Sequence, residues 1–86
     1  MVEGVAKVYN PTGLHDYSIS QLTNFTNKFK CRIYLIQDNI VSNAKSTLNV
    51  LMLDLEQGSD VTVRVDGMNE ENVLKEVIHY IESFKS

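Results

Sequence analysis

The sequence is organised around one stretch, Asn10-Pro11-Thr12-Gly13-Leu14-His15-Asp16-Tyr17-Ser18-Ile19-Ser20, which joins an expected first strand to an expected first helix. Pro11 and Gly13 predict a turn, because proline fixes φ and lacks an N–H group while glycine tolerates positive φ. Apolar or small residues then repeat at helical spacing, at Ile19, Leu22, Phe25 or Thr26, and Phe29. The pattern therefore predicts a helix that begins at or just after the histidine.

This placement gives His15 a chemical environment suited to anions. The first N–H groups of a helix have no partner within the helix, and the helix dipole is positive at that end. Such a helix start binds phosphate and other anions. A histidine there has a neutral nitrogen near pH 7 that can act as a nucleophile, although a histidine near a helix start is also common on protein surfaces.

Composition limits the classes of protein to consider. The chain has 86 residues, a net charge of −3 and one cysteine, Cys31, so we expect one small domain without an internal disulfide. The negative charge disfavours a general nucleic-acid binder. No apolar run approaches the length of a membrane span, and residues 1–4 lack the features of a signal peptide, so we expect a cytoplasmic protein.

Hydrophobic periodicity predicts alternating strands and helices. The expected strands cover residues 2–9, 31–37, 40–43 and 61–65, and the expected helices run from about Asp16 to Asn27, from Thr47 to about Leu55, and onward from Met68 or Asn69. The order β-α-β-β-α-β-α predicts an α+β open-faced sandwich, in which one four-stranded antiparallel sheet is covered on one face by three helices.

Two details of this pattern bear on surfaces. Ser46 is the expected N-cap of the second helix, Gln57-Gly58 its expected end, and its expected apolar stripe consists of Leu48, Leu51, Met52 and Leu55. On the uncovered face of the sheet we expect Tyr34, Ile36 and Ile40, which would leave that face more apolar than is usual for a solvated sheet. Such a face is consistent with a paired or partly covered sheet, including self-association, so the chain is expected to be a monomer or a weak homodimer.

Several segments together resemble a known family. Residues 10–15 resemble the active-site segment of HPr, the histidine-containing phosphocarrier of the bacterial phosphoenolpyruvate:sugar phosphotransferase system. Residues 43–46 are similar to the segment that carries a regulatory serine in Gram-positive members, and residues 28–30, 57–58 and 61–65 also match in register. The resemblance implies one HPr-like domain over residues 1–86 with strand order 1-4-2-3.

The resemblance also implies a role for His15. Phosphate from phosphoenolpyruvate, passed by enzyme I, would reach the imidazole Nδ1 and continue to enzyme IIA. After this histidine the family usually has Ala-Arg-Pro, where this chain has Asp16-Tyr17-Ser18. The missing arginine is the family's phosphate partner; Tyr17 offers one neutral donor and Asp16 adds a negative charge. We therefore expect these three residues to surround the phosphate and to make transfer slow or specialised.

A second role follows from Ser46. The resemblance implies phosphorylation by HPr kinase/phosphorylase at this serine and, in carbon catabolite repression, binding of a transcription regulator. Thr12, Thr47, Leu48 and Leu51 would contribute to partner docking, although Leu48 and Leu51 read equally as core. Thr47 and Asn49 depart from the family's usual larger apolar residue and glycine.

No other chemistry is indicated. His79 has no partners at metal spacing and reads as a surface histidine, Cys31 reads as a strand-edge residue, and no cofactor is expected. Three hypotheses remain: a phosphoryl carrier acted on by other enzymes rather than turning over by itself, a regulatory module working through Ser46, and a scaffold domain that uses neither site. An apolar dimer surface would favour the scaffold, and a monomer at high concentration would count against it.

Overall fold

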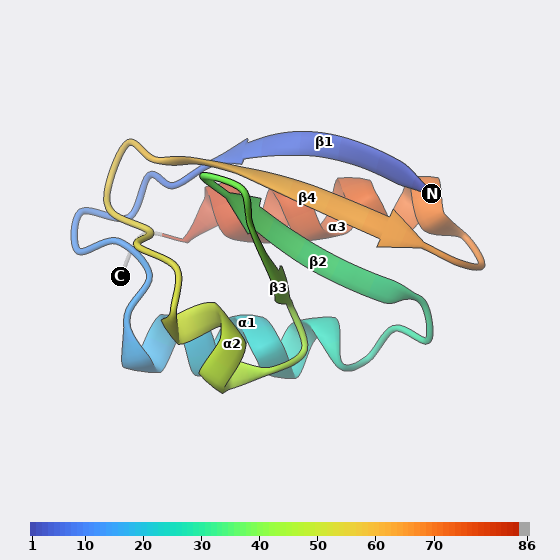
Figure 1. Cartoon of the computed structure of the whole chain (residues 1–86), viewed down its shortest axis with the longest axis horizontal. Coiled ribbons are helices and arrows are strands. Elements are labelled where there is room, and N and C mark those ends of the chain that lie inside the picture. Colours follow the sequence, from blue (N-terminus) through green and yellow to red (C-terminus); the bar gives the residue numbers. More distant parts are fainter. Residues whose placement is uncertain (85–86) are drawn as a thin grey trace.

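The computed structural model describes residues 1–84, apart from the side chain of Asp16. Within them the strands are β1 (Val2–Lys7), β2 (Arg32–Gln37), β3 (Ile40–Asn43) and β4 (Asp60–Asp66), and the helices are α1 (Asp16–Thr26), α2 (Thr47–Leu51) and α3 (Glu70–Ser83). This order is the predicted one. The helices lie on one side of the sheet, with α3 against β1 and β4 and α2 across α1 (Figure 1).

The sheet has the expected topology. Its strand order is β1-β4-β2-β3 with antiparallel pairing throughout, and Val63 of β4 lies between Gly4 of β1 and Leu35 of β2. The fully buried side chains of the core come from the covered face of the sheet, from one stripe of each long helix, from Val50 of α2 and from Val8 after β1. The largest of these are Val8, Ile19, Leu22, Ile33, Leu35, Val50, Val61, Val63, Val65, Val77 and Ile81. The predicted α+β open-faced sandwich is confirmed.

The uncovered face differs from expectation at one residue. Antiparallel partners share a face of the sheet, and Ile36 pairs with Val41 whereas Ile40 pairs with Gln37. Ile40 shares its face with Ser42, which is buried and donates from Oγ to the carbonyl of Asn49 in α2 at 3.1 Å. Ile40 therefore belongs to the edge of the helix side, and the expectation that it joins Tyr34 and Ile36 was wrong. The apolar row on the open face consists of Val5, Thr62, Ile36 and Val41.

The second helix is shorter than predicted. It ends at Leu51, and its fully buried residue is Val50, which the expected stripe did not include. Leu48 and Met52 are 75% and 77% exposed, so the expected stripe does not face the core. Leu55 is buried, but it lies beyond the helix in a segment whose backbone bonds to Leu14 in the loop before α1 and to the side chain of Gln37 in β2.

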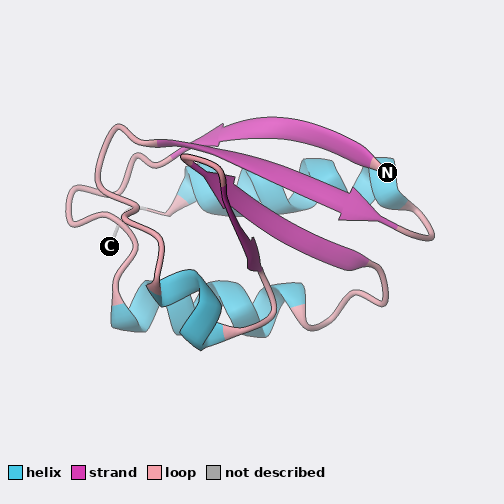
Figure 2. Cartoon of the chain, viewed as in Figure 1, coloured by secondary structure: helices cyan, strands magenta, loops and turns pink. Residues whose placement is uncertain are grey.

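The expected end of that helix has another structural role. Gly58 has φ +88 and lies in a turn, where its N–H donates to the carbonyl of Val8 at 2.7 Å. The Val8 N–H in turn donates to the carbonyl of Ser59 at 2.9 Å. The loops on either side of these contacts, residues 8–15 and 52–59, lie side by side at one end of the sheet (Figure 2). This end carries His15.

Candidate functional site

The loop before α1 is held by bonds at its glycine. Gly13 has φ +70, and a Cβ there would meet the carbonyl oxygen of Leu55 and lie 2.9 Å from Cα of Glu56, so a side chain does not fit. The buried Asn10 donates from Nδ2 to the carbonyl of Gly13 at 2.7 Å, and the Gly13 N–H donates back to the Asn10 carbonyl at 2.8 Å. The Leu14 N–H donates to the carbonyl of Leu55 at 2.8 Å. The peptide unit between Gly13 and Leu14 is thus fixed at both its oxygen and its nitrogen.

His15 follows this peptide directly and is the N-cap of α1. Its backbone is extended, with φ −121 and ψ −171, and its side chain is exposed. Its N–H donates to Ser18 Oγ at 3.4 Å, and its carbonyl accepts the first helical bond from Ile19 at 2.8 Å. The imidazole therefore stands at the positive end of the α1 dipole, beside the N–H groups of the first turn. Thr12, in the same loop, is exposed.

The three residues after His15 are in different environments. Tyr17 is 72% exposed, and its hydroxyl accepts a hydrogen bond from Gln21 Nε2, one helical turn later, at 2.7 Å. Ser18 is buried, and its hydroxyl accepts from the backbone of His15, so it shapes the helix start. The Asp16 side chain lies outside the described part of the chain. The phenol keeps its own O–H free to donate, because the Gln21 bond uses its oxygen as an acceptor.

Ser46 caps the N-terminus of α2 as predicted. Its Oγ accepts from the N–H of Asn49 at 3.3 Å, and the Val50 N–H donates to its carbonyl at 3.0 Å. The next residue, Thr47, shares a 3.0 Å hydrogen bond with the hydroxyl of Thr23 in α1. The two helices that carry the two candidate phosphorylation residues are thus in direct contact.

An exposed apolar patch covers α2 and its end. It consists of Leu48, Leu51 and Met52, which are 75%, 43% and 77% exposed. The alternative that Leu48 and Leu51 are core residues is therefore excluded, and Met52 joins them on the surface. Because Val50 fills the core position of this short helix, the patch makes no contribution to the main core.

The remaining candidate residues lie away from this site. Cys31 is buried and His79 is exposed on α3. Within the described residues, no group of three or more histidine, cysteine or carboxylate side chains is arranged to hold a metal ion. Nor does any described helix have the length and apolar character needed to cross a membrane.

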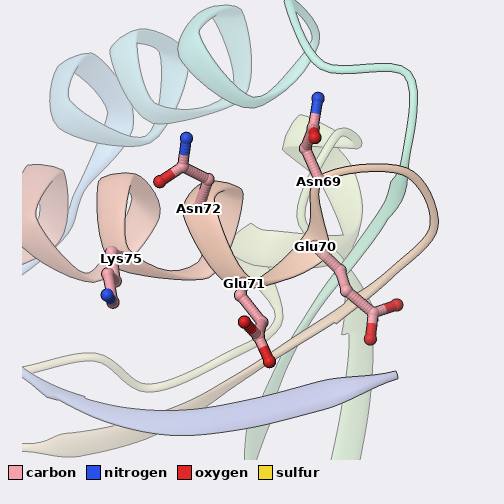
Figure 3. Close-up of a pocket in the computed structure, with 5 residues that line it drawn as sticks. All are labelled: Asn69, Glu70, Glu71, Asn72 and Lys75. Carbon is pink, nitrogen blue, oxygen red and sulfur yellow. The ribbon is translucent and has the colours of Figure 1, made fainter.

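A surface hollow of about 440 Å³ lies at the start of α3. The starts of α3 and α1 lie at opposite ends of the sheet (Figure 1). The hollow is lined by Asn69, Glu70, Glu71, Asn72 and Lys75. Figure 3 shows that the Glu70 and Glu71 carboxylates point away from the side on which the amides of Asn69 and Asn72 lie. The polar groups of this hollow do not converge on one point.

Comparisons with known proteins agree with this geometry. The sequence model of the family described as "PTS HPr component phosphorylation site" matches residues 2–83. The chain belongs to the HPr family of phosphocarrier proteins. It is 30% identical over 71 residues to the phosphocarrier protein HPr of Mycoplasma pneumoniae, covering 81% of each chain. It is 29% identical to the HPr-like protein Crh of Halalkalibacterium halodurans, covering 95% of this chain and 98% of Crh.

A solved structure supports the same family. The crystal structure of HPr-C-His from Thermoanaerobacter tengcongensis superimposes with a TM-score of 0.90 at 32% identity, covering 96% of this chain and 93% of that one. Family and fold, both predicted from the sequence, are therefore confirmed, and the relatives include both HPr and Crh proteins.

Two residues that support the His15 loop or its neighbouring segment were given no role from the sequence. Asn10 was quoted within the active-site segment, and its position before Pro-X-Gly is the available signal, since asparagine side chains commonly bond to nearby backbone in turns. Gln37, whose side chain holds the backbone of Asp54, had no local signal because its partner is 17 residues away.

Proposed function

We propose that the chain is a phosphoryl carrier of the phosphotransferase system, which accepts phosphate on His15 from enzyme I and passes it to enzyme IIA. The observation that carries the proposal is the exposed imidazole at the N-cap of α1, following a peptide that Asn10 and Leu55 hold rigidly. A fixed nucleophile at the N-terminus of a helix suits phosphoryl transfer, in which catalysis consists mainly of positioning and charge stabilisation.

The chemistry needs one neutral imidazole nitrogen. Its lone pair forms a bond to phosphorus while the bond between phosphorus and the donor's leaving atom breaks, and the phosphoryl oxygens retain their negative charge. The N–H groups of the first turn of α1 stabilise that charge by hydrogen bonds and by the helix dipole. Onward transfer to enzyme IIA is the same step in reverse, with His15 as the leaving group.

Residues 16–18 make this carrier slow or specialised. In place of an arginine, Tyr17 offers one neutral O–H donor, which is weaker than a charged pair of N–H groups. Ser18 uses its hydroxyl on the His15 backbone, so it acts on the phosphate through the position of the histidine. The exposed patch of Leu48, Leu51 and Met52 would contact the protein partners, together with Thr12 and Thr47.

The test is intact mass after incubation with phosphoenolpyruvate and enzyme I. We expect a mass increase of one phosphate that is lost in acid and absent from His15→Ala. An ordinary HPr labelled in parallel shows that the enzyme I is active. If that control is labelled and this chain is not, the carrier proposal is wrong.

A second candidate function rests on Ser46. Its hydroxyl caps α2 beside the exposed apolar patch, and one relative is a Crh protein. In this alternative the chain is a regulatory module, phosphorylated on Ser46 by HPr kinase/phosphorylase and then recognised by a transcription regulator. Incubation with ATP and that kinase would give an acid-stable phosphate that Ser46→Ala lacks. An acid-stable label without an acid-labile one would favour this module over the carrier.

A further inference from the structure

Gln37 connects the sheet to the segment that supports the His15 loop. This residue ends β2, and its side-chain amide makes two hydrogen bonds to one backbone residue. Its Nε2 donates to the carbonyl of Asp54 at 2.8 Å, and its Oε1 accepts from the N–H of Asp54 at 3.0 Å. The side chain therefore pairs with Asp54 as a neighbouring strand would.

The segment held in this way is in direct contact with the His15 loop. Asp54 lies between Leu53 and Leu55, both buried, so the segment is fixed by the two hydrogen bonds of Gln37 as well as by the burial of the two leucines. The carbonyl of Leu55 then accepts from the N–H of Leu14, one residue before His15, at 2.8 Å. Two short steps, from Gln37 to residues 54–55 and from there to Leu14, link β2 to the histidine.

Burial alone does not fix this segment to the same degree. Residues 52–56 belong to no helix or strand, and the nearby α2 has five residues and ends at Leu51. The two buried leucines fix how closely the segment packs against the core, whereas directional hydrogen bonds fix its orientation and its position relative to β2. The carbonyl of Leu55 has to point at Leu14 for the peptide before His15 to hold its orientation.

From this geometry we propose that Gln37 is a positioning residue for His15, acting through Asp54, Leu55 and Leu14. The proposal rests on the carrier function for its effect on reaction rate, but its structural part does not depend on that function. Displacement of a reacting group by about 1 Å can cost roughly 100-fold in rate. Since Leu14 keeps its burial and Asn10 still holds Gly13, we expect a smaller loss, of about 10-fold.

The test compares Gln37→Leu, which keeps the size of the side chain and removes both bonds, with Gln37→Glu, which keeps an acceptor for the Asp54 N–H. The matched control is Asn27→Leu. Asn27 likewise makes two side-chain amide bonds to backbone carbonyls, to Thr23 at 2.7 Å and Lys45 at 3.0 Å, but it is the C-cap of α1, at the end of that helix far from His15.

Two readouts are measured on the full chain. The first is hydrogen exchange of the Leu14 amide by NMR, which needs no partner protein. We expect exchange about 10-fold faster in Gln37→Leu, an intermediate effect in Gln37→Glu, and no change in Asn27→Leu relative to other amides of the same variant. The second is the rate of His15 phosphorylation, in which kcat falls about 10-fold while KM for phosphorylated enzyme I stays constant.

The outcomes separate this proposal from the carrier function. Unchanged Leu14 exchange in Gln37→Leu would overturn the positioning role, even if the wild type is phosphorylated normally. Equal losses in Gln37→Leu and Asn27→Leu would show a general effect of lost stability and would also overturn it. If the wild type accepts no phosphate at all, the carrier function fails, while Leu14 exchange still decides whether Gln37 positions the loop.

Discussion

Asn10 and Gly13 are joined by two hydrogen bonds that close the loop before α1. The Asn10 Nδ2 donates to the Gly13 carbonyl at 2.7 Å, and the Gly13 N–H donates to the Asn10 carbonyl at 2.8 Å. Asn10 is fully buried, so its side-chain amide cannot exchange the Gly13 carbonyl for bulk water. The bond to the Gly13 carbonyl, together with that from Leu14 to Leu55, determines where His15 stands.

Replacing Asn10 should therefore lower both stability and activity. For Asn10→Ala we expect a loss of about 1–3 kcal/mol in the free energy of unfolding, because the Gly13 carbonyl loses its buried donor. The measurement is urea denaturation followed by circular dichroism. Asn24→Ala, an exposed asparagine on α1, is the control and should change stability by less than about 0.5 kcal/mol. Equal effects of the two substitutions would contradict this role for Asn10.

Tyr17→Arg should raise the rate of His15 phosphorylation by a standard bacterial enzyme I. An arginine there would add a full positive charge and a pair of N–H donors, and hydrogen bonds to charged groups contribute about 1.5–3 kcal/mol against about 1 kcal/mol for neutral ones. A difference of about 1.4 kcal/mol is a tenfold change in rate. We expect a gain of roughly 10-fold in the initial rate of acid-labile phosphate incorporation, followed by intact mass.

The charge itself needs a control at another place on the same helix. Ser20 is exposed on α1, so Ser20→Arg adds the same charge away from the helix start. Without a larger gain for Tyr17→Arg than for Ser20→Arg, the missing arginine would not explain slow transfer. Tyr17→Phe should lower the rate a few-fold, since it removes the O–H donor while retaining the ring.

The family and the fold were predictable because their signals are local. The turn at Pro11 and Gly13 and the alternation of Val61, Val63 and Val65 each fall within a few residues, and the structure has the expected element at both places. Ile40 was misplaced because alternation was continued through the turn at Asp38 and Asn39. Both turn residues have positive φ, 49 and 69, and this two-residue hairpin sets Ile36 opposite Val41.

The positions of the candidate site residues at helix starts were predictable, but the long-range contacts that support them were not. His15 and Ser46 stand at helix N-caps as expected, since capping depends on neighbours in sequence. The length of α2 was overestimated because Met52 and Leu55 continue the apolar spacing of a helix. In the structure, the bonds of Asp54 and Leu55 to distant residues exclude a longer helix. Such contacts between distant residues produce no periodic pattern in the sequence.

The exposure of Leu48 predicts that this side chain contributes to partner docking and not to the stability of the fold. It is 75% exposed, so Leu48→Ser removes apolar surface that faces solvent and should change stability by less than about 0.5 kcal/mol. If the patch docks enzyme I, KM for phosphorylated enzyme I should rise several-fold while kcat stays constant, because a lost methyl-rich contact weakens binding in the ground state and transition state alike. Met68→Ser, an exposed methionine in the loop before α3, is the control. An unchanged KM would exclude Leu48 from the docking surface.

The stability that the start of β1 gains from its ion pair with Glu70 should depend on pH. The Met1 amino group donates to both carboxylate oxygens of Glu70, at 2.9 and 2.7 Å, and the Gly67 N–H donates to Oε1 at 3.1 Å. The bond from the Met1 amino group, and then that from Gly67, lower the pKa of the Glu70 carboxyl below its ordinary value of 4.5. The bond to Glu70 likewise raises the pKa of the Met1 amino group above 8.0.

The two shifts limit stabilisation from opposite sides. A carboxyl whose pKa is lowered on folding stabilises the fold at pH values above its ordinary pKa, and this stabilisation is lost as the pH falls through the lowered pKa. An amine whose pKa is raised on folding stabilises the fold fully below its ordinary pKa of 8.0, and this stabilisation is lost as the pH rises through the raised pKa. Glu70→Gln should therefore have a lower urea midpoint than the wild type between about pH 5 and 7.5, with the gap narrowing at both more acidic and more alkaline pH. Glu71→Gln, whose carboxylate lies on the same exposed turn, should show a flatter difference across that range. A gap for Glu70→Gln that stayed constant from pH 3 to pH 10 would show that the ion pair does not hold the start of β1.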